Sequence, residues 1–366
     1  MKLKIVISVL LVCMVFLISN QIFAEEPIKL IYSRDELESK WRERIQSFIN
    51  KGSIPLIDLE SRIKRKDGER YIVDFLNVMD KLGIALIAFD TDQAPPGYGT
   101  KGYRWGYYSI ELSNAYPDRF IPTTNGGVNP NWIKQKGGEK KHYIDQLENH
   151  VSSGKYAIMG ELEFRHYWSN GECKRGKGRD VDIPLNSENG HRLFALSENT
   201  GIPFVIHLEP EDEPLENLEE MLSTYPNANV IIAHFTQIRH PEKERKFNSQ
   251  FVHHLLKKYP NLYYDLSIGE PGRKYKCTGK FDTYIWESSI FGQKSNLKPE
   301  YKAILIEFSD RFVVGFDYGG MRPPLSSVIP YREKNIRLIM RNLPTQAKHN
   351  IGYRNAWKLL TGKSWE

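Results

Sequence analysis

Four short apolar runs in this chain each end in a residue that can bind a metal ion. Carboxylate and imidazole groups suit divalent ions such as zinc, manganese and iron. Apolar runs of this length are typical of buried parallel strands, and barrel enzymes keep their chemistry at the carboxyl ends of such strands. The spacing therefore predicts a metal centre at the mouth of a barrel, built from the last residues of runs 157–161, 203–207, 230–234 and 312–317, which are Glu161, His207, His234 and Asp317.

A fifth run, residues 54–58, continues as Asp58-Leu59-Glu60-Ser61-Arg62. Glu60 is a possible metal ligand, or else a structural ion-pair partner of Arg62. Arg62 itself cannot be a ligand, because its guanidinium stays protonated and has no lone pair to offer. On the fourth predicted strand, we expect Glu161 but not Glu163 to face the barrel interior.

The elements that would position these residues follow a repeating pattern. Apolar, β-branched runs alternate with amphipathic stretches, and many of the stretches end at a Gly or a Pro-Asn turn. This alternation predicts an α/β fold, a (β/α)8 TIM barrel with long βα loops over residues 54–366. A helix ending near Asn50 is expected in an N-terminal extension, residues 25–53. The eight strand candidates are residues 55–59, 84–89, 119–122, 157–162, 203–207, 230–234, 262–265 and 311–315.

Residues 1–24 have the pattern of a secretory signal peptide. Lys2 and Lys4 precede an apolar stretch at residues 5–18, and Ala24 closes the segment before an acidic pair. The apolar stretch is shorter than the roughly 20 residues that a membrane span needs. We therefore expect an exported protein, periplasmic or secreted, with no stable membrane span after cleavage. A retained anchor and lipoprotein cleavage at Cys13 are the alternatives.

The net charge of the chain bears on the kind of molecule it binds. The formal net charge is +6, and removal of Lys2 and Lys4 with the signal lowers it to +4, which does not favour nucleic-acid binding. We expect a small-molecule substrate instead.

Cys173 and Cys277 follow the fourth and seventh predicted strands, so both lie on the presumed active face. They can form a disulfide across the mouth in an oxidising compartment, or remain free thiols.

Five segments in the second half of the chain carry a family resemblance. They are residues 203–207 (PFVIH), 230–235 (VIIAHF), 262–267 (LYYDLS), 311–318 (RFVVGFDY) and 355–360 (NAWKLL). In this order they resemble the amidohydrolase-related family of metal-dependent barrels, which includes decarboxylases of the aminocarboxymuconate-semialdehyde type and lactone or amide hydrolases. The resemblance covers roughly residues 54–360.

The resemblance implies roles for the strand-end residues. His207 and Asp317 would bind metal, and His234 would bind metal or orient the reacting water. The chain departs from the family at the first strand, where the paired histidines map onto Glu60 and Arg62. A site of Glu60, His207 and Asp317, with His234 or Glu161 added, is more anionic than the family's site. One divalent ion is implied, and this donor set favours manganese, magnesium or iron over zinc.

Two functions remain open from the sequence. In the first, the barrel is a metal-dependent hydrolase or decarboxylase for a small carboxylate, lactone or amide. Asp317 or His234 would then accept a proton, and Arg62 would hold a substrate carboxylate. In the second, Arg62 pairs with Asp317 in place of a metal, and the barrel binds a ligand or partner without turnover. The direction of the Arg62 side chain discriminates between them.

Overall fold

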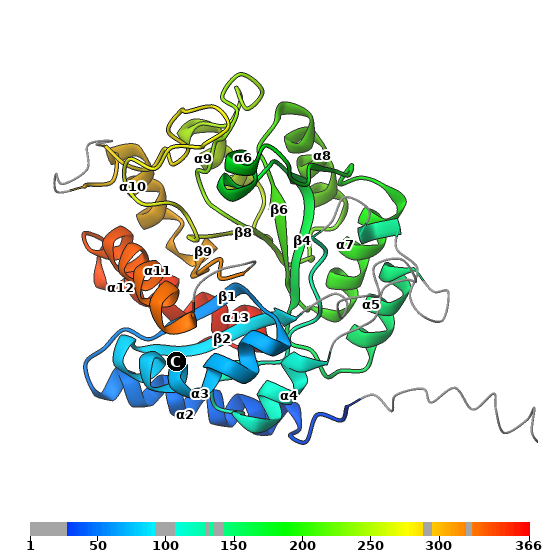
Figure 1. The fold of residues 1–366 in the computed structure, drawn as a ribbon, viewed down its shortest axis with the longest axis vertical. Coiled ribbons are helices and arrows are strands. Elements are labelled where there is room, and N and C mark those ends of the chain that lie inside the picture. Colours follow the sequence, from blue (N-terminus) through cyan, green and yellow to red (C-terminus); the bar gives the residue numbers. More distant parts are fainter. Residues whose placement is uncertain (1–27, 92–106, 129–131, 135–141, 288–294, 320–323) are drawn as a thin grey trace, which may run out of the picture.

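A ring of parallel strands forms the centre of the molecule, and most of the helices surround it (Figure 1). The computed structural model describes residues 28–91, 107–128, 132–134, 142–287, 295–319 and 324–366. The predicted signal peptide lies outside these ranges. The parallel strands are β1 (Leu56–Ile63), β2 (Ile84–Thr91), β3 (Phe120–Ile121), β4 (Met159–His166), β6 (Phe204–Leu208), β7 (Val230–Ile232), β8 (Leu262–Asp265) and β9 (Phe312–Val313), while β5 (Val181–Asp182) runs antiparallel to the end of β4.

Hydrogen-bonded pairing closes this ring. β1, β2 and β3 are neighbours in one sheet, and β4, β6, β7, β8 and β9 follow one another in a second. Isolated parallel bridges join the two sheets at both seams, from Thr123 to Ile158 on one side and from Asp58 to Val314 on the other. The strands thus form a closed (β/α)8 barrel, and the predicted fold class is confirmed.

The helices alternate with the strands as the sequence pattern predicts. The predicted N-terminal helix is α2 (Arg34–Asn50), which begins at a capping box between Ser33 and Glu36. The other helices are α3 (Arg65–Leu82), α4 (Tyr108–Ala115), α5 (Tyr143–Ser152), α6 (Asn170–Arg175), α7 (Glu188–Thr200), α8 (Asp212–Thr224), α9 (Ser249–Lys258), α10 (Pro299–Glu307), α11 (Leu325–Met340), α12 (Thr345–His349) and α13 (Asn355–Thr361), with short helical turns η1 (Trp132–Lys134), η2 (Ser309–Arg311) and η3 (Asn350–Arg354). Within the described ranges, none of these helices combines the length and the apolar character that crossing a membrane requires.

Helices α2 and α13 plug one end of the barrel. Trp41 of α2 and Trp357 of α13 belong to the same buried cluster as Leu59, Val205 and other side chains that fill the barrel interior. A second cluster lies between the strands and the outer helices. The amino-terminal end is thus closed by apolar packing, and the polar residues lie toward the carboxyl ends of the parallel strands.

The first strand extends further than the sequence pattern predicts. The predicted strand stopped at residue 59, but β1 continues to Ile63 and includes both Glu60 and Arg62. Its pairing with β2 shifts register between Asp58 and Ser61, as in a β-bulge. The apolar pattern fails here because buried polar side chains occupy the barrel-facing positions of this strand end.

Cys173 of α6 and Cys277, in the segment after β8, form a disulfide with a Cα–Cα distance of 5.1 Å. This resolves the pairing that the sequence left open. The bond links two loops that are 104 residues apart in the sequence and lie on the carboxyl side of the barrel.

Replacing both cysteines by serine should destabilise the protein by about 2–4 kcal/mol, because the bond restricts the unfolded chain over a long loop. The measurement is the midpoint of thermal unfolding with and without dithiothreitol. Reductant should lower the midpoint of the natural chain toward that of the double variant and leave the variant unchanged. Equal midpoints for both proteins without reductant would contradict a stabilising bond.

Candidate metal centre

Side chains from five strand ends converge at the carboxyl end of the barrel. Their possible ligand atoms fall into two overlapping groups, Glu161 with His207 and His234, and Glu60 with His234 and Asp317. Within each group, the ligand atoms all lie within 4.8 Å of one another. The structure therefore brings together every residue that the sequence predicted as a ligand, and it places His234 in both groups.

His207, in β6, lies between two carboxylates. Its Nδ1 is 3.1 Å from Glu161 Oε1, and its Nε2 is 3.1 Å from Glu209 Oε1. Burial opposes a charge on this ring, yet the hydrogen bonds to Glu161 and Glu209 raise the pKa of His207 to about 9. The same contacts outweigh burial for Glu161 and lower the pKa of its carboxyl to about 2. In the metal-free protein, His207 is thus a cation between two anions.

His234 is held in a strained conformation just after β7. Its φ of 63° is in the left-handed region, where a non-glycine residue is costly. Two contacts hold it there. The backbone N–H donates to Asp265 Oδ1 at 2.9 Å, and ring Nδ1 lies 2.7 Å from Ser267 Oγ. Burial and the charge of His207 lower the pKa of His234 to about 4, so the ring is neutral near pH 7, and Nε2 lies 3.8 Å from Glu161 Oε1.

Asp317 has a left-handed backbone too, with a φ of 46°. Its N–H donates to the carbonyl of Glu60 at 2.8 Å, which ties this segment to β1. Its carboxylate lies 3.2 Å from Arg332 Nη2 and is 29% exposed. Asp317 is therefore the carboxylate of this group with the most access to solvent.

Glu60 is a buried carboxyl in acidic surroundings. Burial raises its pKa well above the usual value, and the charges of Asp317 and Glu161 add to this effect. Its Oε2 is inaccessible and has no hydrogen-bond partner among the described residues. Gly315 permits the close approach of strands here, because a Cβ at this position would lie 2.9 Å from Asp265 Cγ and 3.1 Å from Glu60 Cβ.

Arg62 is directed at Asp90 and Glu161. Its Nε and Nη2 donate to the two oxygens of Asp90 at 2.7 and 3.0 Å, and Nη2 also lies 3.3 Å from Glu161 Oε2. The sequence left Glu60 and Asp317 as possible partners of Arg62. The structure places the guanidinium instead between β2 and β4. Its role in holding substrate stays a prediction, since both of these contacts are to carboxylates of the protein itself.

One expectation about β4 is wrong. Residues two apart on a strand lie on the same side, so Glu161 and Glu163 both point away from the outer cluster that contains Leu162 and Phe164. Glu163 is buried and Glu161 is half-buried, but Glu163 forms an ion pair with Arg179. The ion pair with Arg179, and not the direction of the side chain, keeps Glu163 out of the candidate metal centre.

Sequence reasoning missed the residues that hold the ligands in place. Glu209, Asp265 and Ser267 anchor the two histidine rings or their backbone, and Arg239 donates to Glu209 Oε1 at 2.6 Å. A weak signal exists for Glu209, which follows His207 by two residues at a strand end. Arg239 carries no such signal, because it lies in an irregular segment.

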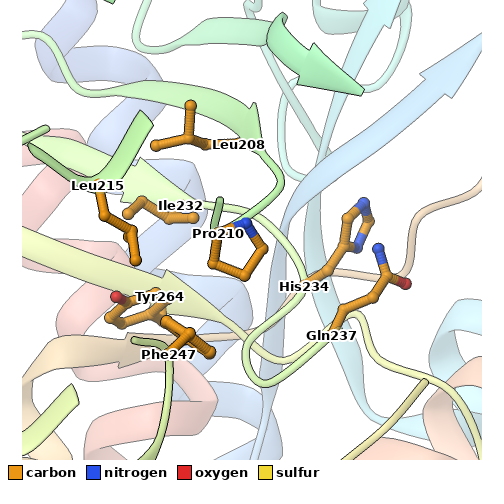
Figure 2. Close-up of a pocket in the computed structure, with 8 residues that line it drawn as sticks. All are labelled: Leu208, Pro210, Leu215, Ile232, His234, Gln237, Phe247 and Tyr264. Carbon is orange, nitrogen blue, oxygen red and sulfur yellow. The ribbon is translucent and has the colours of Figure 1, made fainter. Parts of the chain in front are cut away.

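A small pocket, lined mostly by apolar residues, lies beside the centre (Figure 2). In this view His234 and Gln237 stand apart from the apolar side chains. His234 is the one candidate ligand among the residues that line this pocket. The pocket is therefore distinct from the space where the ligand atoms converge. The lining residues are Leu208, Pro210, Leu215, Ile232, His234, Gln237, Phe247 and Tyr264.

The chain matches a known protein family. The family model described as Amidohydrolase matches residues 165–361. Among solved structures, the chain is similar to one described as an amidohydrolase from Staphylococcus aureus, with 15% identity, 84% of this chain and 99% of that chain covered, and a TM-score of 0.47. It is also similar to 2,6-dihydroxybenzoate decarboxylase from Rhizobium, with 12% identity, coverage of 84% and 98%, and a TM-score of 0.46. No curated protein matches the chain significantly.

Replacing Arg62 by methionine should destabilise the metal-free protein by about 3–5 kcal/mol, because Asp90 and Glu161 lose a guanidinium inside the barrel. The measurement is urea unfolding followed by circular dichroism in the presence of a chelator. Arg65→Met is the matched control. Arg65 also binds a carboxylate, that of Glu111, but its side chain is 48% exposed, so its loss should cost less than about 1 kcal/mol. Similar losses in the two variants would contradict the structural role of Arg62.

Proposed function

This chain belongs to the amidohydrolase family, and from that premise we propose that it is an exported, metal-dependent hydrolase or decarboxylase. Its substrate under this proposal is a small carboxylate, lactone or amide. Glu60, Glu161, His207, His234 and Asp317 would hold one divalent ion.

The observation that carries this proposal is the orientation of the two histidine rings. Each ring has one nitrogen facing Glu161 and the other anchored by the protein, His207 by Glu209 and His234 by Ser267. Histidines that bind metals have this arrangement, in which an anchor keeps a proton on one ring nitrogen and the other nitrogen binds the ion.

The donor set also fits a divalent ion. The unpartnered, buried Glu60 Oε2 is an oxygen that a cation would satisfy, and burying such a carboxylate without compensation is costly. Three carboxylates and two imidazoles favour manganese or iron, with magnesium and zinc as further candidates.

The proposed chemistry divides between the ion and the protein. A bound divalent ion supplies Lewis acidity, which activates water and polarises a substrate carbonyl. Asp317 accepts a proton in this scheme, because it is the most accessible carboxylate of the group and Arg332 orients it. His234 is the second candidate for this role, since its ring is neutral near pH 7. Arg62 keeps Glu161 ionised and directs its Oε1 toward the histidines.

A metal-free binding barrel is the second candidate function. Arg62 partly compensates the charge of Glu161, and Arg239 compensates that of Glu209, without any metal. Arg332 likewise lies 3.2 Å from Asp317, so Glu60, whose buried Oε2 has no hydrogen-bond partner among the described residues, is the acid left for an ion to balance. The two functions therefore differ in the metal content of the protein.

Purified mature protein should contain about one transition metal ion per chain by elemental analysis. Glu60→Gln and Asp317→Asn should each lower this content strongly, because each removes an anionic donor. Asp180→Asn is the matched control, since Asp180 is an exposed carboxylate at the same end of the barrel that binds Arg165. Its metal content should equal that of the natural chain.

If the natural chain binds no manganese, iron or zinc even after these ions are added, the hydrolase proposal fails and the metal-free barrel stands. If Asp180→Asn loses as much metal as Asp317→Asn, the ion binds elsewhere or without specificity.

We also propose that the protein acts outside the cytoplasm. The signal-like pattern of residues 1–24 supports this, and so does the disulfide, because such bonds persist in oxidising compartments. After expression of the whole chain in a bacterium, the exported protein should begin at Glu25 by mass spectrometry. Full-length protein retained in the cytoplasm, with Met1 intact, would contradict export.

A further inference from the structure

We propose that Glu209, held by Arg239, is a positioning residue that fixes the tautomer of His207 and thereby sets the affinity of the metal centre. This inference rests on the proposed function, since it concerns the same ion. It goes further by assigning a role in metal binding to two residues that are not themselves ligands.

Contacts on three sides fix the position of Glu209. It follows β6 directly, and its backbone N–H donates to the carbonyl of Arg165 in β4 at 2.9 Å. Its side chain is buried, and Oε1 lies 3.1 Å from His207 Nε2 and 2.6 Å from Arg239 Nη1. Oε2 is buried without a partner in the described part of the chain. The carboxylate thus uses one oxygen for both the ring and the guanidinium.

This geometry controls which nitrogen of His207 carries a proton. A neutral imidazole has one N–H, and an ionised carboxylate can only accept a hydrogen bond. An ion that bound His207 would displace one of the two protons of the ring. Glu209 would keep the proton on Nε2, so the lone pair released for the ion is that of Nδ1, on the side of Glu161. A carboxylate acceptor also makes the ring a stronger donor to a metal, which is why such partners affect metal affinity.

Arg239 makes this arrangement possible in a buried setting. An uncompensated carboxylate inside the barrel would cost several kcal/mol, and the guanidinium offsets this cost at hydrogen-bond distance. The Arg239 guanidinium in turn lies over the ring of Tyr275, 5.4 Å from its centroid. Since Tyr275 is two residues before Cys277, the anchor connects the centre to the loop that the disulfide holds.

His234 provides an internal comparison. Its Nδ1 faces the carbonyl oxygen and the hydroxyl of Ser267, which are neutral groups. His207 alone of the two rings has an ionised anchor. Loss of the negative charge at residue 209 should therefore weaken the bond between His207 and the metal ion and leave the bond between His234 and the ion unchanged.

Glu163 offers a matched control for a variant of Glu209. It is a buried glutamate, it is paired with an arginine, Arg179, and it lies two residues beyond a proposed ligand, Glu161, as Glu209 lies two beyond His207. Its carboxylate binds Arg179 through both oxygens. Glu163→Gln therefore breaks the same kind of ion pair without touching a histidine anchor.

The experiment is calorimetric titration of the metal-free full chain with Mn²⁺, Co²⁺ or Zn²⁺. Glu209→Gln should bind about 10–100-fold more weakly than the natural chain. Glu209→Ala should bind more weakly still, because the glutamine amide oxygen can still accept from Nε2 and alanine cannot. Glu163→Gln should bind like the natural chain. The visible absorption of bound Co²⁺ should shift in both Glu209 variants and not in Glu163→Gln, and circular dichroism checks that each variant is folded.

The outcomes separate this inference from the proposed function. If the natural chain binds no metal, the proposed function fails and the anchor has nothing to act on. If the natural chain binds metal and Glu209→Gln binds it equally well with an unchanged Co²⁺ spectrum, the anchor role is overturned and the metal centre stands. Equal weakening in Glu209→Gln and Glu163→Gln would mean a general loss of barrel stability, which also overturns it.

Discussion

The Glu161 carboxylate is the contact on which the barrel mouth depends. One oxygen lies near both histidine rings and the other accepts from Arg62, so this single group connects β1, β4, β6 and the segment after β7. A buried carboxylate is unfavourable unless cations compensate it, and here His207 and Arg62 do so from opposite sides. The chain of alternating charges continues outward through Glu209 to Arg239 on one side and through Arg62 to Asp90 on the other. Each charge in this chain of contacts is thus compensated by a neighbour that the fold must supply.

Buried acids in this barrel have two different uses. Asp58 and Asp265 accept hydrogen bonds from backbone N–H groups of neighbouring strand ends, including those of Phe316 and His234. They hold the backbone in place, and Asp265 helps maintain the strained conformation of His234. Glu60 and Asp317 instead point donor atoms toward the shared space around His234. The first pair maintains the geometry in which the second pair can act, and strain of this kind is typical of functional sites.

Much of this architecture follows from local sequence pattern. Apolar runs predicted the strands, and polar residues at their ends predicted Glu161, His207, His234 and Asp317, because parallel strands in a barrel all end on the same side. The pattern failed at β1, where Glu60 and Arg62 lie inside the strand. It also failed for Glu163, whose separation from the centre comes from its pairing with Arg179. The two errors differ in cause. At β1, buried polar side chains stand where an apolar pattern is expected, and on β4 the expectation overlooked that residues two apart share a face.

The sequence by itself determined the barrel and the chemical type of its strand-end residues, since periodicity and residue type are local properties of the chain. Only the tertiary structure decided the partner of each charged group. The sequence offered two acidic partners for Arg62, Glu60 and Asp317. Arg62 instead binds Asp90, which is 28 residues away, together with Glu161, which is 99 residues away. Glu209 gained its role because Arg239 returns to it from the segment after β7. Such pairings depend on distance in space and on the free energy of burying charge, and neither can be predicted from the local sequence.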